Sequence, residues 1–543
     1  MSALPSIPRL TVETSSPSAA TDSLVDRLVE ERVASSLANQ DPTLWGPRAQ
    51  QEAARRLAWV ALPLSSRPLL ATVDALWSDL HSDGIDRVVL AGMGGSSLAP
   101  EVICATSGVP LTVLDTTDPG EVADALVGDL ARTVLVVSSK SGSTVETDSH
   151  RRIFAAAFAE AGLDPATHLV VVTDPGSPLQ RIAEEQGYRA VITAEPNVGG
   201  RYSALTAFGL VPAGLARADI ANLLDDAELQ APWLAADDPA NPALRLAAAL
   251  AVGHAAGAEK VVLADTGSGI VGFADWAEQL IAESTGKDGT GLLPVVVRNP
   301  AAPGFADAGP DATLVAIGPE ESSAAAAVTV SGTLGGQLLL WEYAIAVVGR
   351  LLGINPFDQP DVEAAKVAAR AQLDAAHKSA ARPAPAFVEG DVAVYPVGDW
   401  LPAGVATLSD ALQALITATP ARGYLAVQAY LDRIADASAA VLRTELARRS
   451  KLQTTFGWGP RFLHSTGQYH KGGHQNGSFL QVTGAVGTDI PVPGTDFTLG
   501  DLQQAQALGD ADVLAAHGRP VLRVHLLDRA AGLVALAHAL GEL

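Results

Sequence analysis

Residues 87–102 read RVVLAGMGGSSLAPEV, and residues 133–147 read TVLVVSSKSGSTVET. Each stretch begins with a short apolar, β-branched run, passes through a loop rich in glycine and hydroxyl side chains, and then enters a helical pattern. A strand that is buried on both faces of a parallel sheet has such a continuous apolar run. These two stretches therefore predict strand–loop–helix units whose loops lie at the carboxyl ends of parallel strands.

Similar apolar runs occur in three series along the chain, separated by segments with helical spacing. Strands that alternate with helices are typical of parallel, doubly wound sheets. The further runs are LTVLDT (111–116), HLVVVTD (168–174), RAVITA (189–194), KVVLADTG (260–267), LLPVVVR (292–298), TLVAIG (313–318), AAVTVSG (326–332), DVAVYPVG (391–398), YLAVQAYL (424–431), SFLQVTG (478–484) and PVLRVHLL (520–527).

We predict an α/β protein with two doubly wound parallel sheets, preceded by a helical segment and followed by a third α/β region. The clearest linker is ARPAPAFVEG (381–390), because proline and glycine interrupt regular structure. The expected divisions are 1–80 for an N-terminal tail and helices, 81–235 for the first sheet domain with the two quoted loops, 236–380 for the second sheet domain, and 381–543 for a C-terminal α/β region that completes the second domain.

The composition excludes several classes of protein. The 543 residues contain 36 Lys and Arg against 60 Asp and Glu, a formal net charge of −24 at pH 7. Such an acidic chain is a poor partner for nucleic acid or an anionic membrane. Cys104 is the only cysteine, which excludes a disulfide framework and a thiolate metal site. No signal-peptide pattern and no uncharged apolar run of 18 residues is found, so we expect a soluble, cytoplasmic protein.

The two quoted loops suit a phosphate group. Six of the ten residues of SSKSGSTVET (138–147) carry hydroxyls, and Lys140 adds a positive charge before a helix N-terminus, where anions are favoured. The first loop alone is equally well explained as an ordinary glycine-rich turn, and its G-x-G-G is not the dinucleotide fingerprint. The second loop alone is better explained as a polar loop with Ser/Thr helix caps. Two such loops at successive strand ends favour a phosphorylated small molecule.

Three further motifs narrow the interpretation: NVGGRYSALTAFGLVPAGLA (197–216), WAEQLIAESTGK (276–287) and GINPFDQPDVEAAK (353–366). With the two loops they resemble, in order, the motifs of the glucose-6-phosphate isomerase family, which has the sugar isomerase (SIS) fold. The resemblance implies two SIS-type sheets and an aldose–ketose isomerase that interconverts glucose 6-phosphate and fructose 6-phosphate in glycolysis and gluconeogenesis. It implies neither a cofactor nor a metal.

The resemblance also implies roles for individual residues. Glu283 would move the proton between C2 and C1, Arg201 would stabilise the cis-enediolate, and Lys366 would act near the ring oxygen. The 6-phosphate and the sugar would be bound by Gly95, Ser96, Ser139, Lys140, Ser141, Thr144, Glu146, Gly200 and Gln359.

The chemistry of Glu283 and Arg201 agrees with these roles. A proton next to a carbonyl is weakly acidic, so its removal needs a positioned carboxylate and a cation that meets the developing oxyanion. Without the motif, Glu283 would be read as a solvated helix carboxylate, and Arg201 as a structural ion-pair partner. The preceding glycines, Gly199 and Gly200, argue against the structural reading because they leave room for a ligand.

The ring-opening histidine is missing from the place where the family has it, since residues 288–340 contain no histidine. We expect the replacement in the segment GWGPRFLHSTGQYHKGGHQNGSFLQVTG (457–484), an arrangement that resembles the isomerase half of actinobacterial transaldolase–isomerase fusions. We predict His470 as the ring-opening acid/base, with His464 in reserve. A metal site on these histidines and His474 is the competing interpretation, but their spacing fits no common zinc pattern and Lys471 would repel a cation.

Three alternative functions remain. A bifunctional glucose/mannose-phosphate isomerase would share the site. A non-catalytic sugar-phosphate-binding SIS protein would need the phosphate loops but neither Glu283 nor Arg201. An amidotransferase-type isomerase would need a nucleophilic cysteine, and Cys104 lies within a helical pattern. The expected partner is a small sugar phosphate, and the family resemblance suggests a homodimer.

Overall fold

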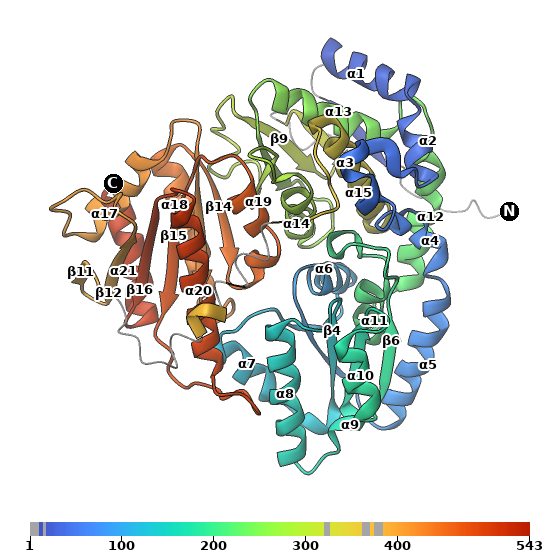
Figure 1. Cartoon of the computed structure of the whole chain (residues 1–543), viewed down its shortest axis with the longest axis horizontal. Coiled ribbons are helices and arrows are strands. Elements are labelled where there is room, and N and C mark those ends of the chain that lie inside the picture. Colours follow the sequence, from blue (N-terminus) through green and yellow to red (C-terminus); the bar gives the residue numbers. More distant parts are fainter. Residues whose placement is uncertain (1–9, 15–17, 320–325, 361–366, 368–369, 374–383) are drawn as a thin grey trace.

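A computed structural model describes residues 10–14, 18–319, 326–360, 367, 370–373 and 384–543. Within them the strands form three separate sheets, arranged around a common centre in Figure 1. The first sheet is wholly parallel, with the order β3-β2-β4-β5-β6. Its strands are β2 (Arg87–Gly92), β3 (Thr112–Leu114), β4 (Thr133–Ser139), β5 (Leu169–Thr173) and β6 (Ala190–Thr193).

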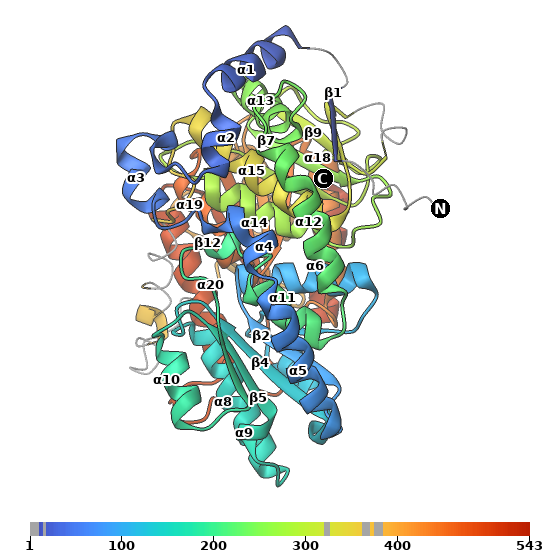
Figure 2. The same cartoon turned by 90° about the vertical axis from the view of Figure 1, so that its right-hand side faces the viewer.

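The first sheet is buried on both faces, as its continuous apolar runs predict. Along β4, Val134 and Val136 belong to one hydrophobic cluster, whereas Leu135 and Val137 belong to another. Figure 2 shows α5 (Pro68–Ser82) and α11 (Ala207–Leu215) on one face of this sheet, and α8 (Val145–Glu160) on the other. The doubly wound arrangement is therefore confirmed for the first sheet.

The second sheet has the order β1-β10-β9-β7-β8, in which all pairs are parallel except β1 with β10. The predicted runs form its four parallel strands. The short strand β1 was not predicted, because it lies in a Ser- and Thr-rich segment with no apolar run. The strands are β1 (Thr11–Thr14), β7 (Lys260–Asp265), β8 (Leu293–Val297), β9 (Ala312–Ile317) and β10 (Val328–Ser331).

The C-terminal region forms a third sheet, with the order β11-β12-β16-β15-β13-β14. Its strands hydrogen-bond among themselves and do not extend the second sheet, although the two sheets share a buried cluster that joins Leu293 and Val295 to Tyr424 and Phe479. The region thus meets the second sheet through this cluster and through hydrogen bonds such as those from Lys260 to the Arg422 carbonyl and from Gln453 to the Gly304 carbonyl, and the domain boundaries stay a prediction. The strands are β11 (Phe387–Glu389), β12 (Val392–Val397), β13 (Tyr424–Tyr430), β14 (Gln453–Trp458), β15 (Gly477–Gly484) and β16 (Val521–Leu526).

Helices cover these sheets and carry much of the site. In the described part of the chain, no helix is both long enough and apolar enough to cross a lipid bilayer. The principal remaining helices are α1 (Ala19–Glu30), α6 (Leu98–Ser107), α7 (Pro119–Leu126), α12 (Ile220–Leu234), α13 (Pro242–Ala255), α14 (Phe273–Thr285), α15 (Leu334–Leu352), α17 (Leu408–Ala418), α18 (Val441–Ser450), α19 (Gly467–Gly472), α20 (Leu499–Ala516) and α21 (Arg529–Glu542).

Candidate active site

The hydroxyl-rich loop after β4 forms a compact turn at the N-terminus of α8. Ser139 Oγ lies 3.0 Å from Thr144 Oγ1 and accepts a hydrogen bond from the Gly142 amide at 3.2 Å. Thr144 occupies the N-cap of α8, but its side chain makes no cap hydrogen bond. The first amides of the helix are therefore open to an anion, which is the arrangement that phosphate binding needs.

Lys140 is already paired in this structure. Its ammonium group forms an ion pair with Asp174 and donates to the Pro196 carbonyl at 3.2 Å. Burial lowers the pKa of Lys140, although Asp174 acts in the opposite direction. An anion that draws Lys140 to itself must therefore displace Asp174.

A close contact between two glycines brings the loop after β2 against the segment that carries Arg201. A Cβ atom on Gly95 would lie 1.9 Å from the Gly200 carbonyl oxygen, so no larger residue fits at this position. The two short helical turns in contact are η3 (Gly94–Ser96) and η5 (Gly200–Tyr202). Predicted residues Gly95, Ser96 and Gly200 therefore lie together beside Arg201.

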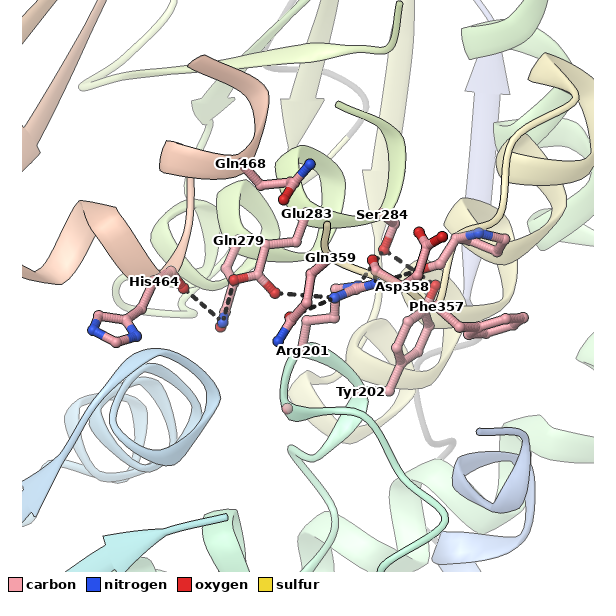
Figure 3. A network of polar contacts seen from close by, with 12 residues as sticks. Arg201, Tyr202, Gln279, Glu283, Ser284, Phe357, Asp358, Gln359, His464 and Gln468 are labelled. Carbon is pink, nitrogen blue, oxygen red and sulfur yellow. Dashed lines mark hydrogen bonds and ion pairs between the residues drawn. The ribbon is translucent and has the colours of Figure 1, made fainter. Parts of the chain in front are cut away.

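Arg201 is the centre of a buried polar network, which Figure 3 shows. Its side chain is 2% exposed, and its Nη1 donates to Glu283 Oε2 and to Gln359 Oε1, each at 3.2 Å. Nε donates to Ser284 Oγ at 3.0 Å, and Nη2 donates to the Pro356 and Asp358 carbonyls. Residues from distant parts of the sequence thus meet at the Arg201 guanidinium group. Among them are the predicted base, Glu283, and Gln359.

Glu283 projects from α14 into this network. Gln279, one turn earlier on the same helix, lies 3.5 Å from Glu283 Oε1 through its Nε2. Burial raises the pKa of Glu283 above its ordinary value, and Arg201 and Gln279 offset only part of that rise. A raised pKa makes the carboxylate a stronger base than an exposed glutamate, which suits proton abstraction.

Lys287 fixes the segment that presents Gln359. Its ammonium group donates to the Asn355 carbonyl at 2.8 Å, to the Asp358 carbonyl at 2.7 Å and to Asp358 Oδ1 at 2.8 Å. Burial and the nearby Arg201 lower the pKa of Lys287 to about 8, against the effect of Asp358. Lys366, predicted near the ring oxygen, lies outside the described residues.

His464 reaches the same site from the C-terminal region. Its Nε2 lies 3.1 Å from Glu146 Oε1, and its carbonyl accepts a hydrogen bond from Gln279 Nε2 at 2.9 Å. Gln506, on α20, donates to the same Glu146 oxygen at 2.7 Å. Burial would raise the pKa of Glu146, but His464, a backbone hydrogen bond and His150 together outweigh burial, and the pKa is lowered. Glu146 is therefore an ionised partner for the histidine.

His470 lies elsewhere. Its side chain is buried, its Nδ1 lies 3.0 Å from the Tyr424 hydroxyl, and its ring packs on Tyr424 and Phe479. Burial and the neighbouring cations Lys471 and Arg519 keep its pKa well below the ordinary value. In the part of the chain that the structure describes, no hydrogen bond or ion pair links His470 to the network around Arg201.

Several network residues were not predicted. Gln279, Ser284 and Lys287 lie within the quoted motif 276–287, so the motif signalled them although no role was assigned. Gln506 has no local signal, because a glutamine in an Ala- and Leu-rich helix carries no spacing that marks it as functional.

Known proteins resemble this chain over the same regions. The family model described as phosphoglucose isomerase matches residues 66–290. A glucose-6-phosphate isomerase of Thermosynechococcus vestitus is 31% identical over 377 residues, which cover 56% of this chain and 71% of the relative. One of Acaryochloris marina is 34% identical over 237 residues, which cover 40% of this chain and 45% of the relative.

Solved structures share the architecture. A hypothetical protein from Thermus thermophilus superposes with a TM-score of 0.58 at 26% identity, covering 67% of this chain and all of the other. A glucose-6-phosphate isomerase from Chlamydia trachomatis superposes with a TM-score of 0.52 at 20% identity, covering 66% of this chain and 86% of the other. The second likeness shows a common fold alone.

Proposed function

The chain belongs to the glucose-6-phosphate isomerase family, and we propose that it interconverts glucose 6-phosphate and fructose 6-phosphate through a cis-enediolate. The observation that supports this most directly is the buried contact between Glu283 and Arg201, in a chain that also has the hydroxyl-rich loop at the start of α8. A sugar-phosphate sensor would need that loop but would not need a buried base paired with a guanidinium group.

In the proton transfer, the charged side chains of Glu283 and Arg201 act together at C1 and C2 of the substrate. Glu283 takes the proton from C2 of the open-chain aldose, and the electron pair moves to O1 as the C1–C2 double bond forms. Arg201 stabilises the negative charge of the enediolate. The protonated Glu283 then returns the proton to C1 while the proton of the O2 hydroxyl passes to O1, which leaves a hydroxyl group at C1 and the ketone at C2. No redox cofactor is needed, because the hydrogen moves as a proton within one molecule.

The phosphate binds at the other end of the substrate. Ser139, Ser141 and Thr144 supply hydroxyl donors, and the N-terminal amides of α8 supply the favourable end of the helix dipole. Lys140 exchanges its ion pair with Asp174 for one with the phosphate. Ser96 and Gly95 line the sugar between the two ends.

We assign ring opening to His464 in place of the predicted His470. Ring opening requires a proton to leave the O1 hydroxyl and another to reach the ring oxygen, so the group must touch the substrate and accept or donate at neutral pH. His464 is part of the polar network and is partnered by the ionised Glu146. His470 is held in an aromatic core as a neutral ring, which suits neither requirement.

The test of the proposed reaction is the turnover of Glu283→Gln with glucose 6-phosphate. Loss of a positioned general base should lower kcat by roughly 10²–10⁴-fold, while the affinity for sorbitol 6-phosphate, which has no carbonyl and cannot react, is retained. Glu278→Gln is the matched control. Glu278 lies on the same helix, faces a separate cavity, and has a pKa raised well above its ordinary value by burial and Asp275, so glutamine mimics its protonated form.

Near-normal turnover of Glu283→Gln would overturn the proposal. Assaying mannose 6-phosphate alongside glucose 6-phosphate distinguishes the bifunctional alternative. His464→Ala should be slower than His470→Ala with cyclic substrate, and the opposite ranking would reinstate His470. The homodimer and the cytoplasmic location stay predictions.

A further inference from the structure

A second cavity lies in the C-terminal region, between α20 and the third sheet. Its volume is about 380 Å³, which falls within the range of small-ligand pockets. It is lined by residues of β12, of the end of β15, of β16 and of the first turns of α20, including Tyr395, Thr483, Gln504 and Arg523. The opposite side of α20 carries Gln506, which donates to Glu146 in the active site. The cavity is therefore separate from the sugar-phosphate site.

Arg523 is a buried cation that forms no ion pair among the described residues, although the Asp512 carboxylate attracts it from beyond ion-pair distance. Its side chain lies on the cavity wall, the residue is 6% exposed, and its Nε has no hydrogen-bond partner. The guanidinium carbon lies 4.1 Å from the centre of the Tyr395 ring. Across the residues that the structure describes, Arg523 forms no ion pair and no hydrogen bond. A buried charge without a partner is costly, and buried arginines in proteins are normally paired.

The carboxylates that line the cavity are already engaged. Asp489 accepts hydrogen bonds from the Gly500 amide at 2.9 Å, the Ile490 amide at 2.8 Å and the Thr498 hydroxyl at 2.6 Å. Asp501 forms a capping box with Thr498 at the start of α20. Both acids therefore serve the N-terminus of the helix, and neither lies within ion-pair distance of Arg523. Asp512 attracts Arg523 only from beyond ion-pair distance, so the guanidinium group has no direct ion-pair partner among the described residues and is available to a ligand.

We propose that this cavity binds a small metabolite through an oxyanion, a carboxylate or a phosphate, paired with Arg523. A guanidinium group binds either oxyanion through two parallel hydrogen bonds, and the stacking on Tyr395 holds its plane in place for that contact. The Gln504 amide lies on the same wall and is suited to the neutral part of the ligand, whereas the Thr483 hydroxyl already contacts His525 Nδ1 at 2.9 Å and the Val524 carbonyl at 3.3 Å. The inference does not depend on the isomerase reaction.

The test is the number of anions bound per chain, measured by isothermal titration calorimetry with inorganic phosphate and, separately, with pyruvate. We expect the wild-type chain to bind phosphate, pyruvate or both at the cavity, in addition to any binding at the active site. For each anion that binds there, Arg523→Gln should bind one equivalent fewer than the wild type. Binding of phosphate alone or of pyruvate alone at this site identifies the source of the oxyanion. Arg443→Gln is the matched control, because Arg443 is equally buried but donates to the Pro303 carbonyl and to Thr444, and it should keep the wild-type number.

A second readout guards against misfolding. In chloride buffer without either anion, Arg523→Gln should melt at or above the wild-type temperature, because it removes an unpaired buried charge. Arg523→Lys keeps the positive charge but loses the planar guanidinium group that can form two parallel hydrogen bonds. It should therefore bind the anion at least about tenfold more weakly than the wild type. The proposal is wrong if Arg523→Gln binds as many anions as the wild type, if Arg523→Lys binds as tightly, or if the wild type binds neither anion outside the active site.

Discussion

Replacing Arg461 with methionine tests whether ion pairs between the C-terminal region and the first sheet place His464 in the site. Arg461 Nε lies 2.6 Å from Asp115 Oδ2, and its Nη2 contacts Glu101 at 2.5 Å. Arg461 and His464 begin and end the same short helical turn. Burial alone would lower the pKa of Arg461, but Asp115 and Glu101 raise it, so the guanidinium group is charged at every relevant pH.

The size of the effect follows from Asp115. Its side chain is 1% exposed, and Arg461 is its only ion-pair partner among the described residues, whereas Glu101 keeps Arg433. Leaving one buried member of such a pair unpaired costs about 3–5 kcal/mol. At about 1.4 kcal/mol per factor of ten, the docked position of the turn becomes roughly 10²- to 4 × 10³-fold less favoured. We expect kcat/KM for glucose 6-phosphate to fall by up to that factor.

The assay separates a positioning role from a general loss of structure. If His464 is displaced, ring opening limits the rate, and the deuterium isotope effect with 2-deuterated glucose 6-phosphate should fall toward unity. His464→Ala should show the same change, and Arg461→Lys should recover part of the loss. Arg132→Met, which removes an exposed ion pair with Asp86, is the control and should leave both kcat/KM and the isotope effect unchanged. An isotope effect that rises, or stays at the wild-type value while the rate falls, would refute the reasoning.

Three further predictions concern the network around Arg201. Gly95→Ala places a methyl group against the Gly200 carbonyl, so the Arg201 turn must move, and kcat/KM should fall by at least about 10²-fold while circular dichroism stays native. Gln279→Leu removes a hydrogen bond that lowers the pKa of Glu283, so the pKa of Glu283 should rise further. Because Glu283 must be ionised to act as a base, the acidic limb of the pH profile of kcat/KM should move to higher pH. A pH profile of kcat/KM that is unchanged in Gln279→Leu would show that Gln279 does not influence the pKa of Glu283. Trp59→Ala deletes a fully buried ring that stacks on Tyr202 and meets Tyr343 edge-on, and denaturant unfolding should show a loss of about 3–5 kcal/mol.

Local sequence patterns predicted most of the fold. The strands of the first sheet could be recognised because each is a continuous apolar run between polar loops, and the same holds for the parallel strands of the second. Three edge strands could not. The strand β11 is the short stretch FVE, inside the segment 381–390 that was predicted as a linker. The strand β1 is the polar stretch TVET, and β14 begins QTT, so neither has the apolar character that marks a buried strand.

The predicted site was incomplete for a different reason. Glu283 and Arg201 belong to motifs with fixed local spacing, whereas the partners of His464 are set by tertiary packing. His464 and Glu146 are separated by 318 residues, and Gln506 and Glu146 by 360. Nothing in the local pattern around 457–484 distinguishes the histidine that faces Glu146 from the one that packs on Tyr424, so the choice of His470 could be examined only in three dimensions.

The proposed catalytic residues come from widely separated parts of the chain, and this affects when activity can arise during synthesis. Arg201 and Glu283 both lie in the first part of the chain to be made, so the proton-transferring pair can form while the ribosome is still translating the remainder. His464, Gln506 and Arg461 emerge much later and must dock on surfaces that are already folded. A nascent or prematurely terminated chain that ends before residue 464 lacks the proposed ring-opening histidine, so we expect it to have no activity on the cyclic sugar.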